Sequence, residues 1–282
     1  MDTITLVESY PREDQRVVAL EIVRAGGGPA AVAAVTLARL GISVGIIGTI
    51  GDDEDGQLVL NIFEREGVNT EGISIGISAT AGAVIVVSKE RNERAISTRQ
   101  PSVQASPSAR ACALAAATRW IHVDHVGFSQ LGALGISRGK GPKISFDAGY
   151  GVKDIDASTV DLFVPNGPAL LERNPDLNLE EAVELEALQN KNVVVATDGG
   201  NGSIGFDTTL ARADSFAVNI VSTLGAGDVF HGTLVAQMLE NRPLPEALLR
   251  SNAVAALSCR GLDGQSMIPT VTELELFLKG AK

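Results

Sequence analysis

Short apolar stretches rich in β-branched residues alternate with helical patterns along most of the chain. Most of these stretches end in a turn that carries Gly, Asn or Asp. This alternation is typical of βαβ units, in which helices cover both faces of a mainly parallel sheet. It predicts a doubly wound α/β fold, in which ligands bind beyond the carboxyl ends of the strands. The predicted strands lie at 42–50, 119–128, 143–149, 160–167 and 192–200, and a helix is predicted at 57–67.

Two β-rich segments, at 16–25 and 80–98, do not fit a doubly wound sheet. The second predicts a hairpin, because two β-rich runs flank the polar turn Lys89–Glu93. We expect both segments to form a small β flap, or lid, beside the main sheet; the alternative is an antiparallel edge of that sheet. The first clear strand pattern already belongs to the flap, so a core strand either lies upstream of the first residue or is absent. The domain prediction is a single domain over 1–282 with lid strands inserted at about 10–25 and 80–99.

The composition is that of an ordinary globular protein, with 45% hydrophobic and 20% charged residues. No apolar run of about 18 residues occurs, which predicts no membrane span, and the acidic N-terminus does not resemble a signal peptide. The net charge of −11 argues against a nucleic-acid or anionic-membrane partner. It does not exclude a small anionic ligand held by local cations. Cys112 and Cys259 lie in apolar helical patterns and predict buried free thiols of a cytoplasmic protein.

A glycine-rich turn opens the helical pattern "AGGGPAAVAAVTLARLG" at 25–41. Pro29 suits the first helical position and Gly41 suits the stop. The glycines at 26–28 would let a ligand lie against bare backbone at the positive helix end. The alternative is a close contact between helix and sheet. The turn lacks the lysine and Ser/Thr of a Walker loop, and it lacks the spacing of a dinucleotide-binding turn.

Two further turns follow predicted strands. In "GTIGDDEDGQ" (48–57), the aspartates lack the spacing and the terminal Glu of an EF-hand. We therefore interpret them as capping and turn residues rather than as a Ca²⁺ site. In "VVVATDGGNGS" (193–203), Thr197, Gly199 and Gly202 come just beyond a buried strand. Flexible backbone there would pack along a nucleotide phosphate chain, and a plain loop is the equal alternative.

The stretch "STLGAGDVFHGTLVAQML" (222–239) places a carboxylate directly after Gly-Ala-Gly at the start of an apolar helix. Apolar side chains recur at helical spacing from Val229, so the helix starts near Ala226–Gly227. Its N–H groups over Gly225–Asp228 would form an anion hole for a transferring phosphoryl group. Asp228 cannot bind phosphate, because like charges repel, but it can take a proton from a hydroxyl; the alternative is a plain cap. Hole and base together predict phosphorylation of an alcohol.

These motifs, in this order, resemble the ribokinase-like (PfkB) family of sugar kinases over nearly the whole chain. The early stretch "GGGPAAVAAVTLARLGISVGIIGTIGDDEDG" resembles the family's Gly-Gly turn and its Gly-Asp-Asp-x-x-Gly turn. "ATDGGNG" resembles its Thr-x-Gly-x-x-Gly, and "SNAVAALSCRGLDGQSMIP" its C-terminal nucleotide-lining helix and loop. "TLGAGDVFHG" resembles Asp-Thr-x-Gly-Ala-Gly-Asp-x-Phe-x-Gly, the most specific of these signatures.

The resemblance implies a ribokinase-like fold with a Rossmann-like core and a β lid. It also implies ATP as phosphoryl donor, Mg²⁺ bridging the ATP phosphates, and a homodimer formed through the lids. Asp228 would be the catalytic base and Gly225, Ala226 and Gly227 the anion hole. By the same resemblance, ATP phosphates or ribose would lie near Thr197, Gly199 and Gly202, the purine near Asn252 and Gly264, and sugar hydroxyls near Asp2, Gly27 and Gly28.

Four positions depart from the family's pattern. Ser222 replaces the Asp that helps to hold an activating K⁺, which leaves no basis to expect activation by a monovalent cation, and Leu224 replaces a Thr. The family's Asn-x-x-Glu, linked to Mg²⁺ and phosphate, reads Asn166 to Ala169 without the acid. Asn166 stays a predicted cofactor contact, and no residue is assigned to the metal. Val32 replaces a sugar-binding Asn, which weakens a ribose or adenosine acceptor.

The glycine turn without that Asn, together with "GDVFHG", is most similar to the sulfofructose kinase branch, whose sugar carries a sulfonate. A sulfonate needs cationic or N–H donors. The candidates are Arg16 and Arg24 on the first flap strand, Arg94 and Arg99 on the second, and His125 after a core strand. Solvated edge charges and a strand-end histidine are the alternatives. His122 is expected to pack in the core, and His231, in the first helical turn, to be structural.

The sequence therefore predicts an ATP-dependent sugar kinase that transfers the γ-phosphoryl group to a sugar hydroxyl, with 6-deoxy-6-sulfofructose as a candidate acceptor. Acceptors of fructose, ketohexose or ribose type are alternatives. A catalytically silent regulator that binds sugar or nucleotide is another. A dinucleotide-dependent dehydrogenase lacks its glycine fingerprint.

Overall fold

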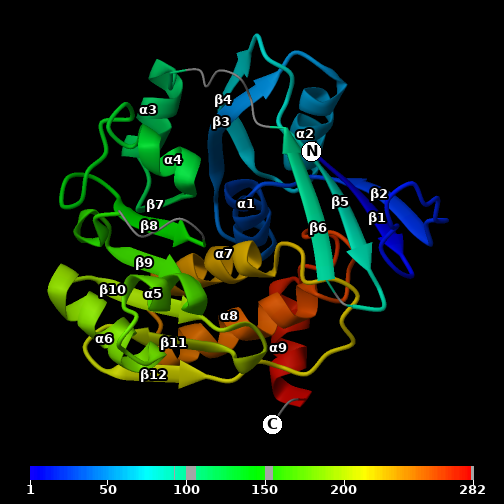
Figure 1. The fold of residues 1–282 in the computed structure, drawn as a ribbon. Helices are drawn as coiled ribbons and strands as arrows, with labels where there is room; N and C mark the ends of the chain where they lie inside the picture. The colour runs from blue at the N-terminus through cyan, green and yellow to red at the C-terminus, as the bar shows by residue number, and fades with distance from the viewer. Residues whose placement is uncertain (92, 100–105, 150–154, 281–282) are drawn as a thin grey trace.

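The computed structural model describes residues 1–91, 93–99, 106–149 and 155–280. Within these residues the strands form a sheet of six, a sheet of four and a parallel pair (Figure 1). The four-stranded sheet lies at the upper right of Figure 1, away from the six-stranded sheet. The predicted flap is therefore a sheet of its own, and the alternative of an antiparallel edge is wrong.

The six-stranded sheet has the strand order β12-β11-β10-β9-β8-β7. The strands from β7 to β10 run parallel, whereas β11 and β12 are antiparallel to their neighbours. This arrangement confirms the predicted mainly parallel α/β sheet. The strands are β7 (Trp120–Val123), β8 (Lys143–Ala148), β9 (Leu162–Pro165), β10 (Val193–Thr197), β11 (Ser203–Phe206) and β12 (Leu210–Ala213).

The strand predicted at 119–128 is too long. β7 ends at Val123, and α4 (His125–Gln130) follows at once. The cause is Asp124, whose Oδ1 accepts a hydrogen bond from the Gly127 N–H at 2.8 Å. An aspartate in this position caps a new helix and stops the strand.

Helices cover both faces of this sheet, as the sequence predicts. On one face α7 packs against β7 and β8, and α8 packs against β11 and β12; on the other, α6 packs against β10 and β11. The remaining helices lie around these layers (Figure 1). The helices besides α4 are α1 (Pro29–Arg39), α2 (Glu54–Arg65), α3 (Ala109–Ala116), α5 (Gly167–Arg173), α6 (Leu179–Asn190), α7 (Ala226–Leu239), α8 (Leu244–Ser258) and α9 (Val271–Gly280).

The parallel pair joins β3 (Gly45–Gly51) to β4 (Asn69–Gly76) through α2. Asp53 caps α2: its Oδ1 accepts from the Gly56 N–H at 2.8 Å, and its Oδ2 accepts from the Thr80 N–H at 2.9 Å. The hydrogen bond from the Thr80 Oγ1 to the Asp53 Oδ1, together with these two backbone bonds, lowers the pKa of the Asp53 carboxyl. The acidic turn therefore serves as a cap, as predicted.

The four-stranded lid has the order β2-β1-β5-β6, with β1 (Asp2–Val7), β2 (Glu21–Ala25), β5 (Gly82–Ser88) and β6 (Glu93–Arg99). The hairpin prediction is confirmed, although Asn92 in its turn lies outside the described residues. The first lid strand is shorter than predicted, since residues 16–20 lie outside any strand. β1 was not predicted as a strand. Its signal is the alternation of Thr with apolar residues in "TITLV".

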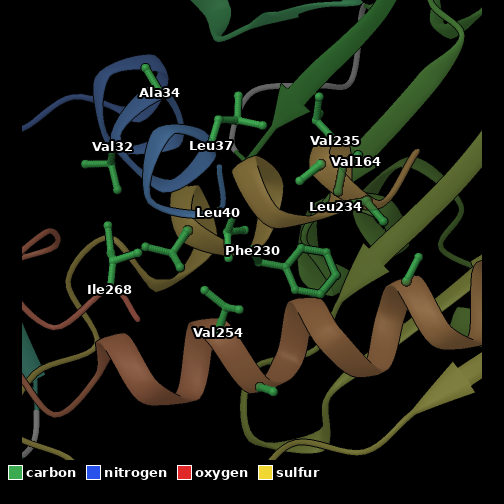
Figure 2. Close-up of a cluster of buried hydrophobic side chains, with 14 of the residues drawn as sticks. Val32, Ala34, Leu37, Leu40, Val164, Phe230, Leu234, Val235, Val254 and Ile268 are labelled. Atoms are coloured by element: carbon green, nitrogen blue, oxygen red, sulfur yellow. The ribbon is translucent and has the colours of Figure 1, made fainter. Parts of the chain in front are cut away.

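Alternation along the strands splits the core into two clusters, one on each face of the six-stranded sheet. Leu162, Val164 and Val195 face α1, α7 and α8, whereas Phe163 and Val194 face α6. Figure 2 shows the first cluster, in which Phe230 and Leu234 of α7 lie between side chains of α1 and α8. Strands buried on both faces explain the continuous apolar runs in the sequence.

Both cysteines are free; Cys259 is buried as predicted, whereas Cys112 is only half-buried. Among the described residues, no helix combines the length and apolarity needed to cross a bilayer.

Helices α1 and α7 approach each other at backbone distance through Gly232. A Cβ atom built on Gly232 would lie 2.7 Å from the Ala33 carbonyl oxygen and 2.9 Å from the Thr36 Cβ. Neither neighbour can yield without moving α1. Only glycine lets the two helices pack at this distance.

We therefore expect Gly232→Ala to destabilise the protein by about 1–3 kcal/mol, because overpacking outweighs the better helix propensity of alanine. The measurement is the free energy of unfolding from urea titration. Gly227→Ala is the matched control in the same helix, since a Cβ there meets no neighbouring atom within 4 Å. A Gly232→Ala protein as stable as the wild type would contradict the close approach.

Candidate active site

Helix α7 begins at Ala226 without a side-chain cap. Gly225 precedes it in the left-handed region, with φ of 75°, and no side chain bonds to the first N–H groups. Helix α1 begins in the same way after Gly28, with φ of 97°. By contrast, the helices from α2 to α6 each carry a side-chain cap. Free N–H groups at a positive helix end suit a phosphate or another anion.

The backbone of the C-terminal loop packs directly on this helix start. A Cβ on Gly225 would lie 2.8 Å from the Gly264 Cα, so both positions need glycine. The Ala226 N–H donates a long hydrogen bond, 3.3 Å, to the Thr223 carbonyl oxygen. The N–H groups of Gly227 and Asp228 are therefore better placed to serve an anion than that of Ala226.

Asp228 lies in the first turn of α7, half-buried. Burial raises the pKa of its carboxyl well above the ordinary value, and the carboxylates of Asp147 and Asp124 raise it further. Arg94 acts in the opposite direction. A carboxylate whose charged form is disfavoured binds a proton more readily than an exposed aspartate does. This property suits a general base, which must accept a proton from the substrate.

The two neighbouring carboxylates come from the carboxyl ends of parallel strands. Asp124 directly follows β7, and Asp147 lies near the end of β8, where its Oδ1 accepts from the Gly149 N–H at 3.0 Å. Sequence reasoning missed both residues. The available signal was an aspartate near the end of the strand predicted at 143–149, and one inside the stretch predicted at 119–128, where the strand in fact stops. Strand ends of this kind are where α/β sheets bind ligands.

The candidate sugar-binding residues Asp2 and Gly27 lie in contact. Asp2 pairs in register with Ala25 and Ala83, and a Cβ on Gly27 would lie 2.0 Å from its Oδ2. Burial raises the pKa of the Asp2 carboxyl, although the chain's amino terminus pulls it down. Asp2 also acts on Asp228 electrostatically. The structure thus brings two of the predicted acceptor residues, Asp2 and Gly27, near the predicted base.

The strand register separates the lid arginines into two faces. Arg94 pairs with Val87 on the inner face, and its Nη1 donates to the Thr223 Oγ1 at 2.9 Å. Arg24 and Arg99 face the other way, and both pair with Asp55 of α2. These two arginines, predicted as sulfonate candidates, are therefore turned away from the site.

The two remaining sulfonate candidates lie elsewhere. Arg16 is exposed in the segment before β2, not on a flap strand as predicted. His125 begins α4, is exposed, and meets Phe146 edge-on at 5.4 Å between ring centroids. Of the predicted cationic contacts, only Arg94 acts on Asp228.

The departures from the expected pattern have structural uses. Ser222 is 5% exposed, and its Oγ accepts from the Leu224 N–H at 3.1 Å. Ser222 also lines a small pocket between the lid and this loop, together with Arg94. Val32 is 2% exposed and belongs to the first core cluster, so an apolar residue replaces a polar contact there.

Four of the predicted nucleotide-binding residues, Asn166, Thr197, Gly199 and Gly202, lie at or just after the ends of β9 and β10. Thr197 forms an isolated parallel bridge with Asn166, and Gly199 and Gly202 follow with φ of 52° and 95°. Asn166 caps α5, with its Oδ1 accepting from the Ala169 N–H at 2.8 Å. Its amide oxygen is thus committed to the helix.

Asn252 is buried in α8 and donates through Nδ2 to the carbonyl oxygens of Ala213 and Asp214, at 2.8 and 3.2 Å. Gly202 approaches the same backbone, since its Cβ would lie 2.1 Å from the Ala213 oxygen. Asn252 therefore holds the end of β12 in place, and its Nδ2 is not free for a purine.

His122 and His231 lie side by side next to Asp147. Their rings meet edge-on at 5.7 Å between centroids, and burial lowers the pKa of both, that of His122 to about 4. His122 packs in the interior as predicted. His231 lies in the second turn of α7 rather than in the first, and is 4% exposed.

The family model of PfkB carbohydrate kinases matches residues 1–128 and 153–271 of this chain. Three similar relatives carry sugar-kinase names. The ATP-dependent ribose-1-phosphate kinase of Halopiger xanaduensis is 27% identical, over 98% of this chain and 94% of the relative. The ribokinase of Bacillus subtilis is 26% identical, over 99% and 96%. Fructokinase-2 of Zea mays is 26% identical, over 88% and 84%.

Solved structures with the same fold include proteins described as ribokinases and as nucleoside kinases. The ribokinase of Thermotoga maritima matches with a TM-score of 0.80 at 24% identity, over 99% of this chain and 96% of that chain. An E. coli protein described as ribokinase II, in complex with ATP and Mg²⁺, matches with a TM-score of 0.77 at 19% identity, over 99% and 96%. These matches establish the predicted ribokinase-like α/β fold.

The burial of Asp228 has a consequence for stability. Its carboxyl has a higher pKa in the folded chain than in the unfolded one, so ionisation is penalised only in the folded state. The penalty is absent below the unfolded pKa and grows as pH rises through the folded pKa. We therefore expect Asp228→Asn to stabilise the ligand-free protein near neutral pH, with a gain that shrinks toward acid pH.

The measurement is the urea midpoint of both proteins between about pH 8 and pH 5. Asp176→Asn is the control, because Asp176 is exposed in the turn after α5. The proposed penalty for burying the ionised carboxylate would be contradicted by an Asp228→Asn protein that is less stable than the wild type. It would also be contradicted by a gain in stability that does not change with pH.

Proposed function

Because the chain belongs to the PfkB family of carbohydrate kinases, we propose that it transfers the γ-phosphoryl group of ATP to a sugar hydroxyl, with Asp228 as general base. The observation that carries this proposal is the position of Asp228: a half-buried carboxyl at the uncapped start of α7. The negative charges of Asp147, Asp124 and Asp2, which lie on separate strands or strand ends, raise the pKa of this carboxyl. At such a position the carboxylate can accept the hydroxyl proton, while the free N–H groups of the helix start bind the transferring phosphoryl group.

In the proposed reaction Asp228 accepts the proton of the attacking hydroxyl. Asp2, which lies against Gly27, orients the sugar through hydroxyl hydrogen bonds, with Gly28 beside it in the chain. The N–H groups at the start of α7 donate to the oxygens of the transferring phosphoryl group, which carry the developing charge. Arg94 lies on the inner face of the lid, near Asp228. This face of the lid excludes water from the reacting atoms.

The residues present fit ATP and Mg²⁺. Two uncapped helix starts offer N–H donors to phosphates. Thr197 ends β10, and Gly199 and Gly202 follow it with positive φ, so the backbone there lacks bulky side chains that would keep a phosphate chain away. Mg²⁺ takes oxygen ligands, and we assign the Asp124 carboxylate to it, together with ATP phosphate oxygens. When bound, Mg²⁺ neutralises phosphate charge. An E. coli structural neighbour described as ribokinase II was solved with both groups.

Replacement of the base tests this proposal. We expect Asp228→Asn to lower kcat by at least about 10²-fold, because general-base catalysis contributes about 10²–10⁴-fold, while ATP binding is retained. The assay is ADP release with Mg-ATP against fructose, fructose 6-phosphate, ribose, adenosine, 2-keto-3-deoxygluconate and 6-deoxy-6-sulfofructose. Asp176→Asn is the control.

Two outcomes would contradict the assignment. Turnover of an acceptor at a near-normal rate by Asp228→Asn would show that Asp228 is not the base. Binding of ATP and sugar by the wild type without ADP release would instead support the catalytically silent regulator.

Within this function we propose an acceptor that carries an anionic group, such as the sulfonate of 6-deoxy-6-sulfofructose or a sugar phosphate. Arg94 supports this, because it lies on the inner face of the lid and acts on Asp228. Val32 in place of a polar residue disfavours a plain ribose. A relative named ATP-dependent ribose-1-phosphate kinase supports a phosphorylated sugar as readily as a sulfonated one.

Paired substitutions on the two faces of the lid test the anionic acceptor. We expect Arg94→Met to lower kcat/KM for an anionic sugar by about 10-fold or more, because hydrogen bonds to charged groups contribute about 1.5–3 kcal/mol. Arg24→Met, on the outer face, should change it by less than about twofold. Equal losses with neutral and anionic sugars would assign Arg94 to the phosphoryl donor instead.

We also propose a cytosolic homodimer that pairs through the lid. The outer face of the lid exposes Ile22 and Val84 at 66% and 57%, and exposed apolar side chains on a sheet face favour an interface. The two free thiols fit a reducing compartment. Sedimentation of the wild type as a monomer at assay concentrations would contradict the dimer.

A further inference from the structure

Three potential metal ligands from three elements meet beneath the site. His122 comes from β7, Asp147 from β8 and His231 from α7. Each offers one ligand atom, and these atoms all lie within 4.8 Å of one another. Asp147 is 8% exposed and His231 is 4% exposed, while His122 is half-buried with its Nε2 covered.

The two imidazoles each leave a buried nitrogen without a partner. Among the described residues, Nε2 of His122 and Nδ1 of His231 make no hydrogen bond. The closest approach to the second is the Asp147 Oδ2, at 3.5 Å, which is too long for a good hydrogen bond. Buried polar atoms are almost always satisfied, since leaving one unpaired costs about 1–3 kcal/mol. Two such atoms beside one carboxylate indicate a missing shared partner.

The other polar atoms of the His122 and Asp147 side chains already have partners. Nδ1 of His122 lies 3.1 Å from the Ser145 Oγ, its neighbour in strand register. The Asp147 Oδ1 accepts from the Gly149 N–H. These contacts fix both side chains so that Nε2 and Oδ2 remain for a ligand. Protein metal sites hold their ligands by such second contacts.

We propose that His122, Asp147 and His231 bind a divalent transition-metal ion of the Zn²⁺ type. Two imidazoles and one carboxylate suit Zn²⁺ and its first-row neighbours, whereas Mg²⁺ prefers oxygen ligands alone. In a tetrahedral site with bonds of about 2.0–2.1 Å, two ligand atoms lie about 3.4 Å apart. The 3.5 Å between His231 Nδ1 and Asp147 Oδ2 matches this spacing. Three protein ligands leave a fourth position for water.

The proposed site differs from the site for Mg-ATP, yet it shares a wall with it. Asp147 is both a metal ligand here and the carboxylate with the largest effect on Asp228. Metal binding itself does not depend on the kinase proposal, because the three ligands are defined by their own geometry. A kinase with such a site would carry a second metal whose identity is set by nitrogen ligands.

Substitutions can remove each metal-binding nitrogen while keeping the other side of the ring. His122→Asn retains an amide where Nδ1 contacts Ser145 and removes Nε2. His231→Gln retains an amide at the position of Nε2 and removes Nδ1. His125→Gln is the matched control, since the third histidine of the chain is exposed at the start of α4 and outside the cluster.

The experiment uses the full chain, stripped with a chelator and equilibrated with Zn²⁺, and with Co²⁺ as a spectroscopic probe. We expect about one Zn²⁺ per wild-type chain, visible bands of tetrahedral Co²⁺, and a rise in Tm on Zn²⁺ addition. His122→Asn and His231→Gln should each weaken binding by at least about tenfold, whereas His125→Gln should bind like the wild type.

Circular dichroism of the metal-free variants establishes that they fold. If His231→Gln does not fold, His122→Asn alone still tests the proposal. Two results would overturn the proposal. One is a wild type that binds no more Zn²⁺ than the double variant His122→Asn/His231→Gln. The other is a loss of binding in His125→Gln equal to the loss in His122→Asn.

Discussion

The close approach of α1 and α7 at Gly232 is the constraint on which the site depends. Both helices start without a side-chain cap, and both present their first turns to the same site. Because their backbones touch through Gly232 and Ala33, neither helix start can move independently of the other. The apolar cluster in Figure 2 then fixes α7 against the sheet and α8. The site is thereby built on rigid elements.

A second constraint is electrostatic. The carboxylates of Asp147, Asp124 and Asp2 all act on that of Asp228 at the start of α7. Such a group is unfavourable without cations, and the described protein residues supply Arg94 from the lid. The arrangement stores unfavourable energy that a bound cation relieves. These like charges lower the free energy of unfolding of the ligand-free protein, and they also create a site that binds positive charge. Functional sites commonly reduce stability in this way.

Much of the fold follows from the sequence alone. The parallel strands, the helix starts at Pro29 and Ala226 and the cap at Asp53 all follow from local rules of period, propensity and capping. The end of β7 was misplaced, because "RWIHVDHVGF" reads as one apolar run unless Asp124 is recognised as a cap. β1 was missed, because its partners in the lid lie far along the chain and only pairing reveals it.

The candidate site was predicted less completely. Asp228, Asp2 and Gly27 come from motifs, and each motif names its residues in order along the chain. Asp124 and Asp147 belong to no motif, and their role follows from the carboxyl ends of strands that meet only in the folded sheet. The faces of Arg24 and Arg94 depend on strand register, which cannot be read from either strand alone. The pairing of His122 with His231 likewise needs α7 placed on β7.

The inner face of the lid has a consequence for the synthesis of the chain. Ile4, Ile85 and Val87 are buried against one another and against Leu262. A ribosome completes the four lid strands by Arg99, long before it releases Leu262. During that interval the apolar inner face lacks its cover. We expect the lid to be the last part of the nascent protein to become ordered, and the part most dependent on chaperones while it waits.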